Sequence, residues 1–188
     1  MLKKVRAFAF DEEKQIIGQS LLDVASSDVR PKSFLEHIRN VSGLLVEKDV
    51  GVYEFAHLSF QEYLAAVQVK ETNQEQLLIE KIKDSWWYET IRLYAAGSNT
   101  TELIRAAMDN PTVKSLTLAY DCLEEGKSVS QEVRQQLESI SLESPEPEVA
   151  KLAASVKLAR RLNKLLRVDE NTQIDQSYIT NAEYQLFV

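Results

Sequence analysis

Few residues of this sequence could perform chemistry. The chain has two histidines, His37 and His57, and a single cysteine, Cys122. No phosphate loop of the GxxxxGK[ST] type occurs, and neither do the GxGxxG, HExxH, CxxC or GxSxG patterns of dinucleotide, zinc, redox or hydrolase sites. One cysteine cannot form an internal disulfide framework or a cysteine-based zinc site. We therefore expect no catalytic residue, no metal site and no enzyme activity of this chain by itself.

The most specific stretch for chemistry is GVYEFAHLSFQEYLAA, residues 51–66. Its His57 stands where an alternating strand pattern ends and a helical pattern begins. Helix N-termini present free backbone N–H groups and a positive dipole end, so they attract anions. A histidine there can hydrogen-bond a phosphate, and imidazoles titrate near neutral pH. On the residues alone the plainer alternative is favoured: His57 caps the turn while Phe55, Phe60 and Leu64 fill the core.

Helices and one hairpin must position this stretch. Apolar residues at helical spacing after Pro31 predict short helices within residues 1–42. The apolar run 44–46, the turn 49–51 and the alternation over 52–55 predict a β-hairpin, the one convincing strand pair of the sequence. Another amphipathic helix follows directly. Helices, a two-stranded wing and a further helix together predict a winged-helix arrangement.

Helical periodicity dominates from about residue 72 onward. Apolar stripes recur in segments of roughly 10 to 18 residues, and Asn110-Pro111, Gly126 and the stretch 144–147 separate them. Trp86 and Trp87 are expected in the core or between helices. The predicted fold class is mainly α: a winged-helix domain over 1–71 with one β-hairpin, followed by an α-helical hairpin stack over 72–167.

Composition and charge argue against a membrane-spanning protein and against a nucleic-acid-binding one. The net charge of −7, with only 5 Gly and 4 Pro, is typical of an ordinary helical, soluble protein. One cysteine and the lack of an apolar run of about 18 residues predict a cytoplasmic protein that spans no membrane. Residues 71–150 hold 7 basic and 15 acidic side chains, which argues against nucleic-acid binding. A basic cluster near the end is expected to be a solvated helix face rather than an anion site. It comprises Lys157, Arg160, Arg161, Lys164 and Arg167.

The segment SGLLVEKDVGVYEFAHLSFQEYLAA, residues 42–66, resembles the end of the winged-helix region in NACHT-type signal-transduction ATPases, the class that includes the NOD-like receptors. The shared pattern is Phe-x-His-x-Ser-Phe-Gln-Glu-aromatic-x-Ala-Ala. It is carried by Phe55, His57, Ser59, Phe60, Gln61, Glu62, Tyr63, Ala65 and Ala66. The resemblance implies that His57 contacts the β-phosphate of ADP and helps to hold the closed, inactive state. It assigns packing roles to Phe55, Phe60 and Tyr63.

The resemblance also implies that this chain is the regulatory part of a bacterial ATPase. The missing phosphate-loop core would lie upstream and bind ADP or ATP with magnesium, whereas no cofactor is expected on this chain. Exchange of ADP for ATP would free the winged helix and permit homo-oligomerisation and contacts with protein partners. The segment 84–97, DSWWYETIRLYAAG, is similar to the helical region after the winged helix in bacterial NACHT proteins. A role in bacterial stress or phage defence is implied by this resemblance only.

The last residues, 171–188, are similar to the opening of a formylglycine-generating-enzyme-like, C-type-lectin-related domain. The residues that fit are Ile179, Thr180, Asn181, Ala182, Tyr184 and Phe187. Thr180 or Asn181 is the expected helix N-cap. Residues 168–188 are thus predicted to be a linker and the truncated start of that domain, without its functional residues. A coincidental amphipathic helix is the alternative.

Two other functions stay open on the sequence. A stand-alone helical scaffold would bind a partner protein through residues 72–165. A winged-helix nucleic-acid binder would use its wing. That wing carries Glu47, Asp49 and Glu54 against Lys48 alone, which is a poor surface for phosphates.

Overall fold

The computed structural model describes residues 7–9, 30–140, 144–175 and 177–185. The chain is mainly helical, as the sequence predicts, and divides into two units, residues 1–65 and 66–188, each described here by itself. The division falls inside helix α3 (Leu58–Glu71). It differs from the limits predicted at residues 71 and 167, because it keeps the end of the chain with the helices of the second unit.

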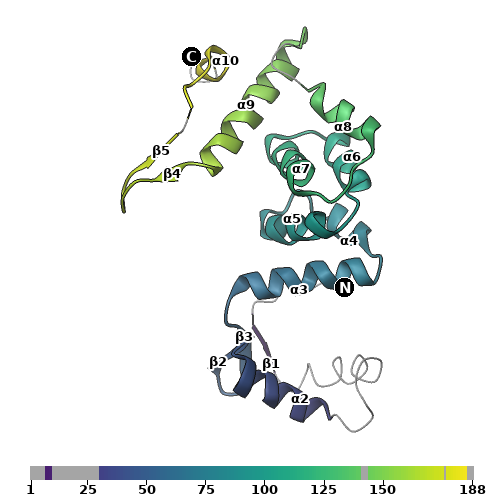
Figure 1. The fold of residues 1–188 in the computed structure, drawn as a ribbon, viewed down its shortest axis with the longest axis vertical. Coiled ribbons are helices and arrows are strands. Elements are labelled where there is room, and N and C mark those ends of the chain that lie inside the picture. Colours follow the sequence, from purple (N-terminus) through teal and green to yellow (C-terminus); the bar gives the residue numbers. More distant parts are fainter. Residues whose placement is uncertain (1–6, 10–29, 141–143, 176, 186–188) are drawn as a thin grey trace. The chain divides into compact units, whose positions relative to one another are not determined.

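A three-stranded antiparallel sheet in the order β1-β3-β2 organises the first unit (Figure 1). The hairpin of β2 (Leu45–Asp49) and β3 (Val52–Phe55) confirms the predicted strand pair. Gly51 in its turn has a φ of +72°, a conformation that glycine adopts without strain. Strand β1 (Ala7–Ala9) pairs with β3 and corrects the expectation of helices alone before residue 42. Three residues are too short to show a strand period, and their pairing comes from backbone hydrogen bonds.

Among the described residues of the first unit, a helical segment before the hairpin contacts β2 through its last turn. Helix α2 (Pro31–His37) begins with Pro31, where the missing N–H costs little, and continues as a π-helical turn, η1 (Ile38–Ser42). Gly43, with a φ of +64°, ends it. The buried Tyr53 of β3 accepts a hydrogen bond from Arg39 Nη1 to its hydroxyl at 3.1 Å, which ties the helical turn to the central strand.

The second unit contains helices where the sequence predicts them after residue 72. They are α4 (Glu75–Ile79), the 3-10 turn η2 (Ser85–Trp87), α5 (Tyr88–Gly97), α6 (Thr101–Asp109), α7 (Val113–Glu125), α8 (Gln131–Glu138) and α9 (Pro147–Asn163). Helix α7 is central, since it contacts α5, α6, α8 and α9. Its Leu116 and Leu118 are fully buried. Helices α4, α6 and α8 have 5, 9 and 8 residues and are thus shorter than the segments of roughly 10 to 18 residues that the sequence predicts.

Local signals in the sequence set the ends of these helices. Thr112 caps α7, accepting a hydrogen bond from Ser115 N at 3.1 Å. Gly126 ends α7 as predicted, and a Cβ there would lie 2.3 Å from the Cys122 carbonyl oxygen, so a larger residue does not fit. Trp87 is buried, which confirms its predicted core position, and Trp86 is half-buried.

A second, very short strand pair follows α9. Strands β4 (Leu166–Arg167) and β5 (Gln173–Ile174) pair antiparallel, so the hairpin over 45–55 is not the only one in the chain. A strand of two residues is too short to show the alternation of apolar and polar residues from which strands are predicted. Helix α10 (Asn181–Tyr184) comes next, and Thr180 is its N-cap, which resolves the choice between Thr180 and Asn181. Phe187 lies outside the described residues.

The single cysteine is part of the core of α7. Cys122 is fully buried and free. Burial, helped by the nearby charges of Asp121 and Glu125, raises the pKa of the Cys122 thiol to about 12. A thiol that stays protonated at neutral pH is a packing residue and no nucleophile.

Glu75, at the start of α4, is ionisable but poorly solvated. Its Oε1 atom is buried and has no hydrogen-bond partner among the described residues. Burial, and then the charge of Glu102, raises the pKa of Glu75, against a smaller lowering by a hydrogen bond with Tyr94. Because the folded pKa lies above the unfolded value of about 4.3, the second unit gains stability as the pH falls toward that value and loses it as the pH rises.

We expect Glu75→Gln to stabilise the second unit at neutral pH. Glutamine keeps the size and the contact with Tyr94 but carries no charge to desolvate, so Tm at pH 7.5 should rise by about 1–4 °C. The gain should shrink as the pH is lowered to 4.5, because the raised pKa of Glu75 lets a larger fraction of its carboxylate take up a proton. Circular dichroism melts at both pH values measure this. The exposed Glu80→Gln is the control and should shift neither melt, whereas a lower Tm for Glu75→Gln would show that the charge stabilises the fold.

Candidate functional site

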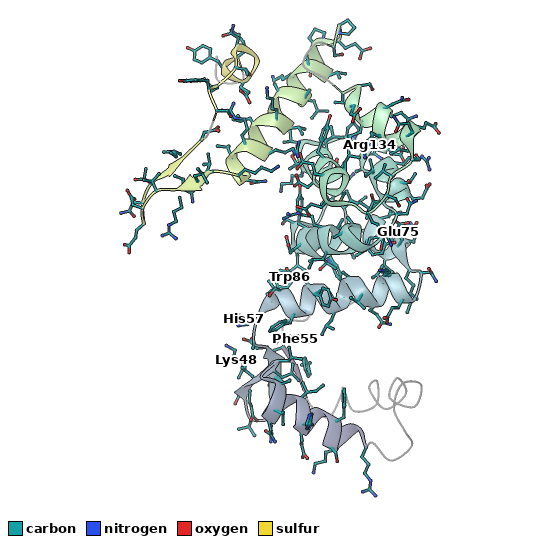
Figure 2. All side chains as sticks on the ribbon, in the orientation of Figure 1. Lys48, Phe55, His57, Glu75, Trp86 and Arg134 are labelled. Atoms are coloured by element: carbon teal, nitrogen blue, oxygen red, sulfur yellow. The ribbon has the colours of Figure 1, made fainter. Side chains whose placement is uncertain are left out.

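His57 stands at the junction between β3 and α3, where the sequence places it. Strand β3 ends at Phe55 and α3 begins at Leu58 (Figure 2). On one side Ala56 N donates a hydrogen bond to the Leu44 carbonyl at 2.8 Å, and on the other the His57 carbonyl accepts one from Phe60 N at 3.1 Å. The backbone is therefore fixed on both sides of His57, at the N-terminal end of a helix of fourteen residues.

The His57 side chain is exposed, and its ring meets the Phe60 ring edge-on with centroids 5.6 Å apart. An exposed imidazole beside a helix N-terminus can receive an anion without uncovering any core. The plainer alternative requires Phe60 and Leu64 to fill the core. Both are exposed in this structure, so that part of the alternative is wrong.

The three residues with predicted packing roles have different surroundings. Phe55 is half-buried, and its ring centroid lies 6.4 Å from that of Phe8 in β1. Phe60 is 38% exposed and Tyr63 is 55% exposed. With Leu64 they lie at helical spacing on one side of α3, here called the Phe60 face. A packing role for Phe60 and Tyr63 needs a surface that the described residues of the first unit do not supply, and it stays a prediction.

Charges on the β2–β3 hairpin are already engaged with one another. Lys48 Nζ lies 2.8 Å from Glu54 Oε1. Glu47 accepts a hydrogen bond from Gly51 N at 3.0 Å, and this bond, followed by one from Tyr53, lowers the pKa of Glu47. Lys48 is the one cation of the hairpin residues 45–55, and it is paired. The alternative of a nucleic-acid-binding wing gains no support from this surface.

The basic cluster is not simply a solvated face, which corrects the expectation. In α9, Arg160 Nε donates to Asp121 Oδ1 of α7 at 3.2 Å, and a second nitrogen of Arg160 pairs with Glu124. Lys164 Nζ also lies 2.9 Å from Glu124. Arg161 pairs with carboxylates that follow α9. Sequence periodicity could not show these pairs, because each depends on which helix or segment packs against α9.

Among the described residues, no group of three or more His, Cys, Asp or Glu side chains is placed to hold a metal ion. No described helix is long and apolar enough to cross a membrane. The pair of the half-buried Arg161 and the buried Glu183 is the arrangement that sequence reasoning missed. Its one local signal was the Thr180-x-x-Glu183 spacing of a capping box, which the structure contains.

Comparison with protein families gives a match over residues 3–69 to a family described as the winged helix-turn-helix domain C-terminal to NACHT. The matched range contains the β2–β3 hairpin, His57 and most of α3. Neither the curated proteins nor the solved structures gave a match. The likeness of residues 171–188 to a formylglycine-generating-enzyme-like domain stays a prediction. Over residues 3–69 the chain is thus similar to the winged-helix domain that follows NACHT, which supports its assignment as a NACHT-associated regulatory part.

Proposed function

We propose that this chain is the regulatory part of a NACHT-type signal-transduction ATPase, in which His57 senses the nucleotide bound to the ATPase core. One observation carries the proposal: the exposed imidazole of His57 at the N-terminal end of α3, within the matched region. The ring is exposed, so it is available to a phosphate. The fixed backbone on both sides aims it from a constant position.

The proposed mechanism is a switch between two states. With ADP in the core, His57 donates a hydrogen bond to the β-phosphate and ties the winged helix to the nucleotide. A hydrogen bond to a charged group contributes about 1.5–3 kcal/mol, enough to shift a two-state equilibrium by about 10- to 100-fold. Exchange of ADP for ATP removes this contact. The winged helix and the helical stack then move and permit homo-oligomerisation and contacts with protein partners.

The nucleotide and its magnesium would be held by the phosphate loop of the core, not by this chain. A single histidine adds one contact and replaces neither the loop nor the magnesium ligands. The chain alone is therefore expected to bind ADP too weakly to retain it and to hydrolyse no ATP. We further propose that the ATPase core covers the Phe60 face, because this face begins within one turn of His57.

Reading the gene upstream of Met1 in the same frame is the first test. A GxxxxGK[ST] phosphate loop there would supply the nucleotide that His57 is proposed to sense. If the upstream frame holds no such loop, His57 has no nucleotide to sense and the proposal fails. The helical scaffold, with residues 72–165 as its binding surface, would then be the better interpretation.

A further inference from the structure

The segment after α9, residues 164–185, is here called the C-terminal arm. It forms the β4–β5 hairpin and returns to α10, which contacts α9 (Figure 1). Among the described residues of the arm, Glu183 is the one buried side chain. Most large apolar residues of the arm are exposed, whereas Leu165, next to α9, is half-buried; the exposed ones are Leu166, Val168, Ile174, Tyr178, Ile179 and Tyr184. Beyond Leu165 the described part of the arm therefore buries no large apolar side chain, and the contacts described below that hold it are polar.

Arg161 of α9 holds the arm at three separate points. Its Nε donates to Asp175 Oδ2 at 2.9 Å, its Nη2 donates to the Ser177 carbonyl at 2.8 Å, and its Nη1 pairs with Glu183. The rigid fork of a guanidinium makes several such bonds at the cost of ordering one side chain. Arg161 thus binds the part of the arm from Asp175 to α10, while Lys164 at the start of the arm pairs with Glu124 of α7.

The charge of the Glu183 carboxylate is stabilised by this contact. Its Oε2 accepts hydrogen bonds from Thr180 N and Thr180 Oγ1, each at 2.7 Å, besides the pair with Arg161. Burial raises the pKa of Glu183, but the bonds from Thr180 and Arg161 outweigh it and lower the pKa to about 2. The carboxylate is therefore charged at neutral pH. A buried charge that loses its partner is strongly destabilising, so Glu183 depends on Arg161 to stay in place.

We propose that the C-terminal arm can detach from α9 and that the contacts of Arg161 hold it in place. While Arg161 is paired, the arm lies against α9. When the pairing is lost, Glu183 returns to water and the arm leaves α9 as a unit, while the helices around α7 stay folded because their core is independent of the arm. This proposal does not depend on the nucleotide-sensing function of His57.

Hydrogen exchange of the full chain at pH 7, followed by mass spectrometry, tests whether Arg161 holds the arm on α9. In Arg161→Ala the protection of the arm residues 173–185 should fall about tenfold or more, since the buried Glu183 loses its cationic partner. Protection in α5–α8 should not change. Glu183→Gln keeps the shape of the side chain and should act in the same way, and it serves as the test if Arg161→Ala does not fold. Arg161→Lys keeps the charge without the fork and should lie between.

Arg134→Ala is the matched control, because Arg134 pairs within α8 with Glu138 at the surface. It should leave the protection of the arm unchanged. Three results would overturn the proposal. The first is an arm that is already unprotected in the unaltered chain. The second is an arm that keeps its protection in both variants. The third is a loss of protection that spreads to α5–α8, which would mean that Arg161 supports the core and does not specifically hold the arm.

Discussion

Replacing His57 by alanine, in the protein that joins this chain to its ATPase core, should weaken the retention of ADP by about 10- to 100-fold, the worth of one hydrogen bond to a charged group. The closed state loses the tie between winged helix and nucleotide, so the fraction of oligomer without a trigger should rise. Displacement of a fluorescent ADP analogue measures the dissociation rate, and size-exclusion chromatography measures the oligomer. Because the side chain is exposed, the fold itself should change little.

His37→Ala is the matched control for this experiment. His37 is the other histidine of the chain, it is exposed, and it ends α2 in the same unit. Its replacement should alter neither ADP release nor the oligomer. A folded His57→Ala protein that releases ADP at the unaltered rate would refute the sensor role, whatever the upstream gene encodes.

Replacing Leu116 by alanine should have the largest effect on stability. Leu116 is fully buried on α7, the helix that contacts α5, α6, α8 and α9. Removing a buried leucine side chain costs about 2–5 kcal/mol of unfolding free energy, because apolar contacts are lost and a cavity is left. We expect about 3 kcal/mol and a Tm lower by roughly 10 °C or more. Urea unfolding followed by circular dichroism measures the change.

Leu162→Ala provides the comparison for that loss. Leu162 is also helical, in α9, but it is 54% exposed. Its replacement should change the free energy of unfolding by at most about 0.5 kcal/mol. Equal losses for the two variants would mean that α7 is not the centre of the core.

The features that the sequence predicts correctly have strong local signals. Gly51 marks a tight turn between two apolar runs, so the hairpin is predictable. Gly126 marks where α7 stops. The position of His57 follows from the same logic, because a change of period from two to 3.6 residues locates a junction between strand and helix.

The features that the sequence does not predict depend on partners distant in the chain. Strand β1 exists because β3 has a free edge, and its three residues show no period of their own. Arg160 and Arg161 are neighbours on a basic helix, but one pairs with α7 and the other with the C-terminal arm. Aromatic residues at helical spacing suggest a core, whereas Phe60 and Tyr63 are exposed, since spacing shows that residues share a face and not what covers it.

The alkylation rate of the buried Cys122 thiol can measure how often helix α7 opens. Cys122 is the only cysteine of the chain, so an alkylating reagent has one target. With the thiol buried and its pKa raised to about 12, the reagent must wait for α7 to open. When opening and closing are fast, the alkylation rate follows the opening equilibrium, and a loss of about 3 kcal/mol in Leu116→Ala should speed it by about 100-fold. In Arg161→Ala the alkylation rate of Cys122 should stay unchanged, while hydrogen exchange in the C-terminal arm becomes faster.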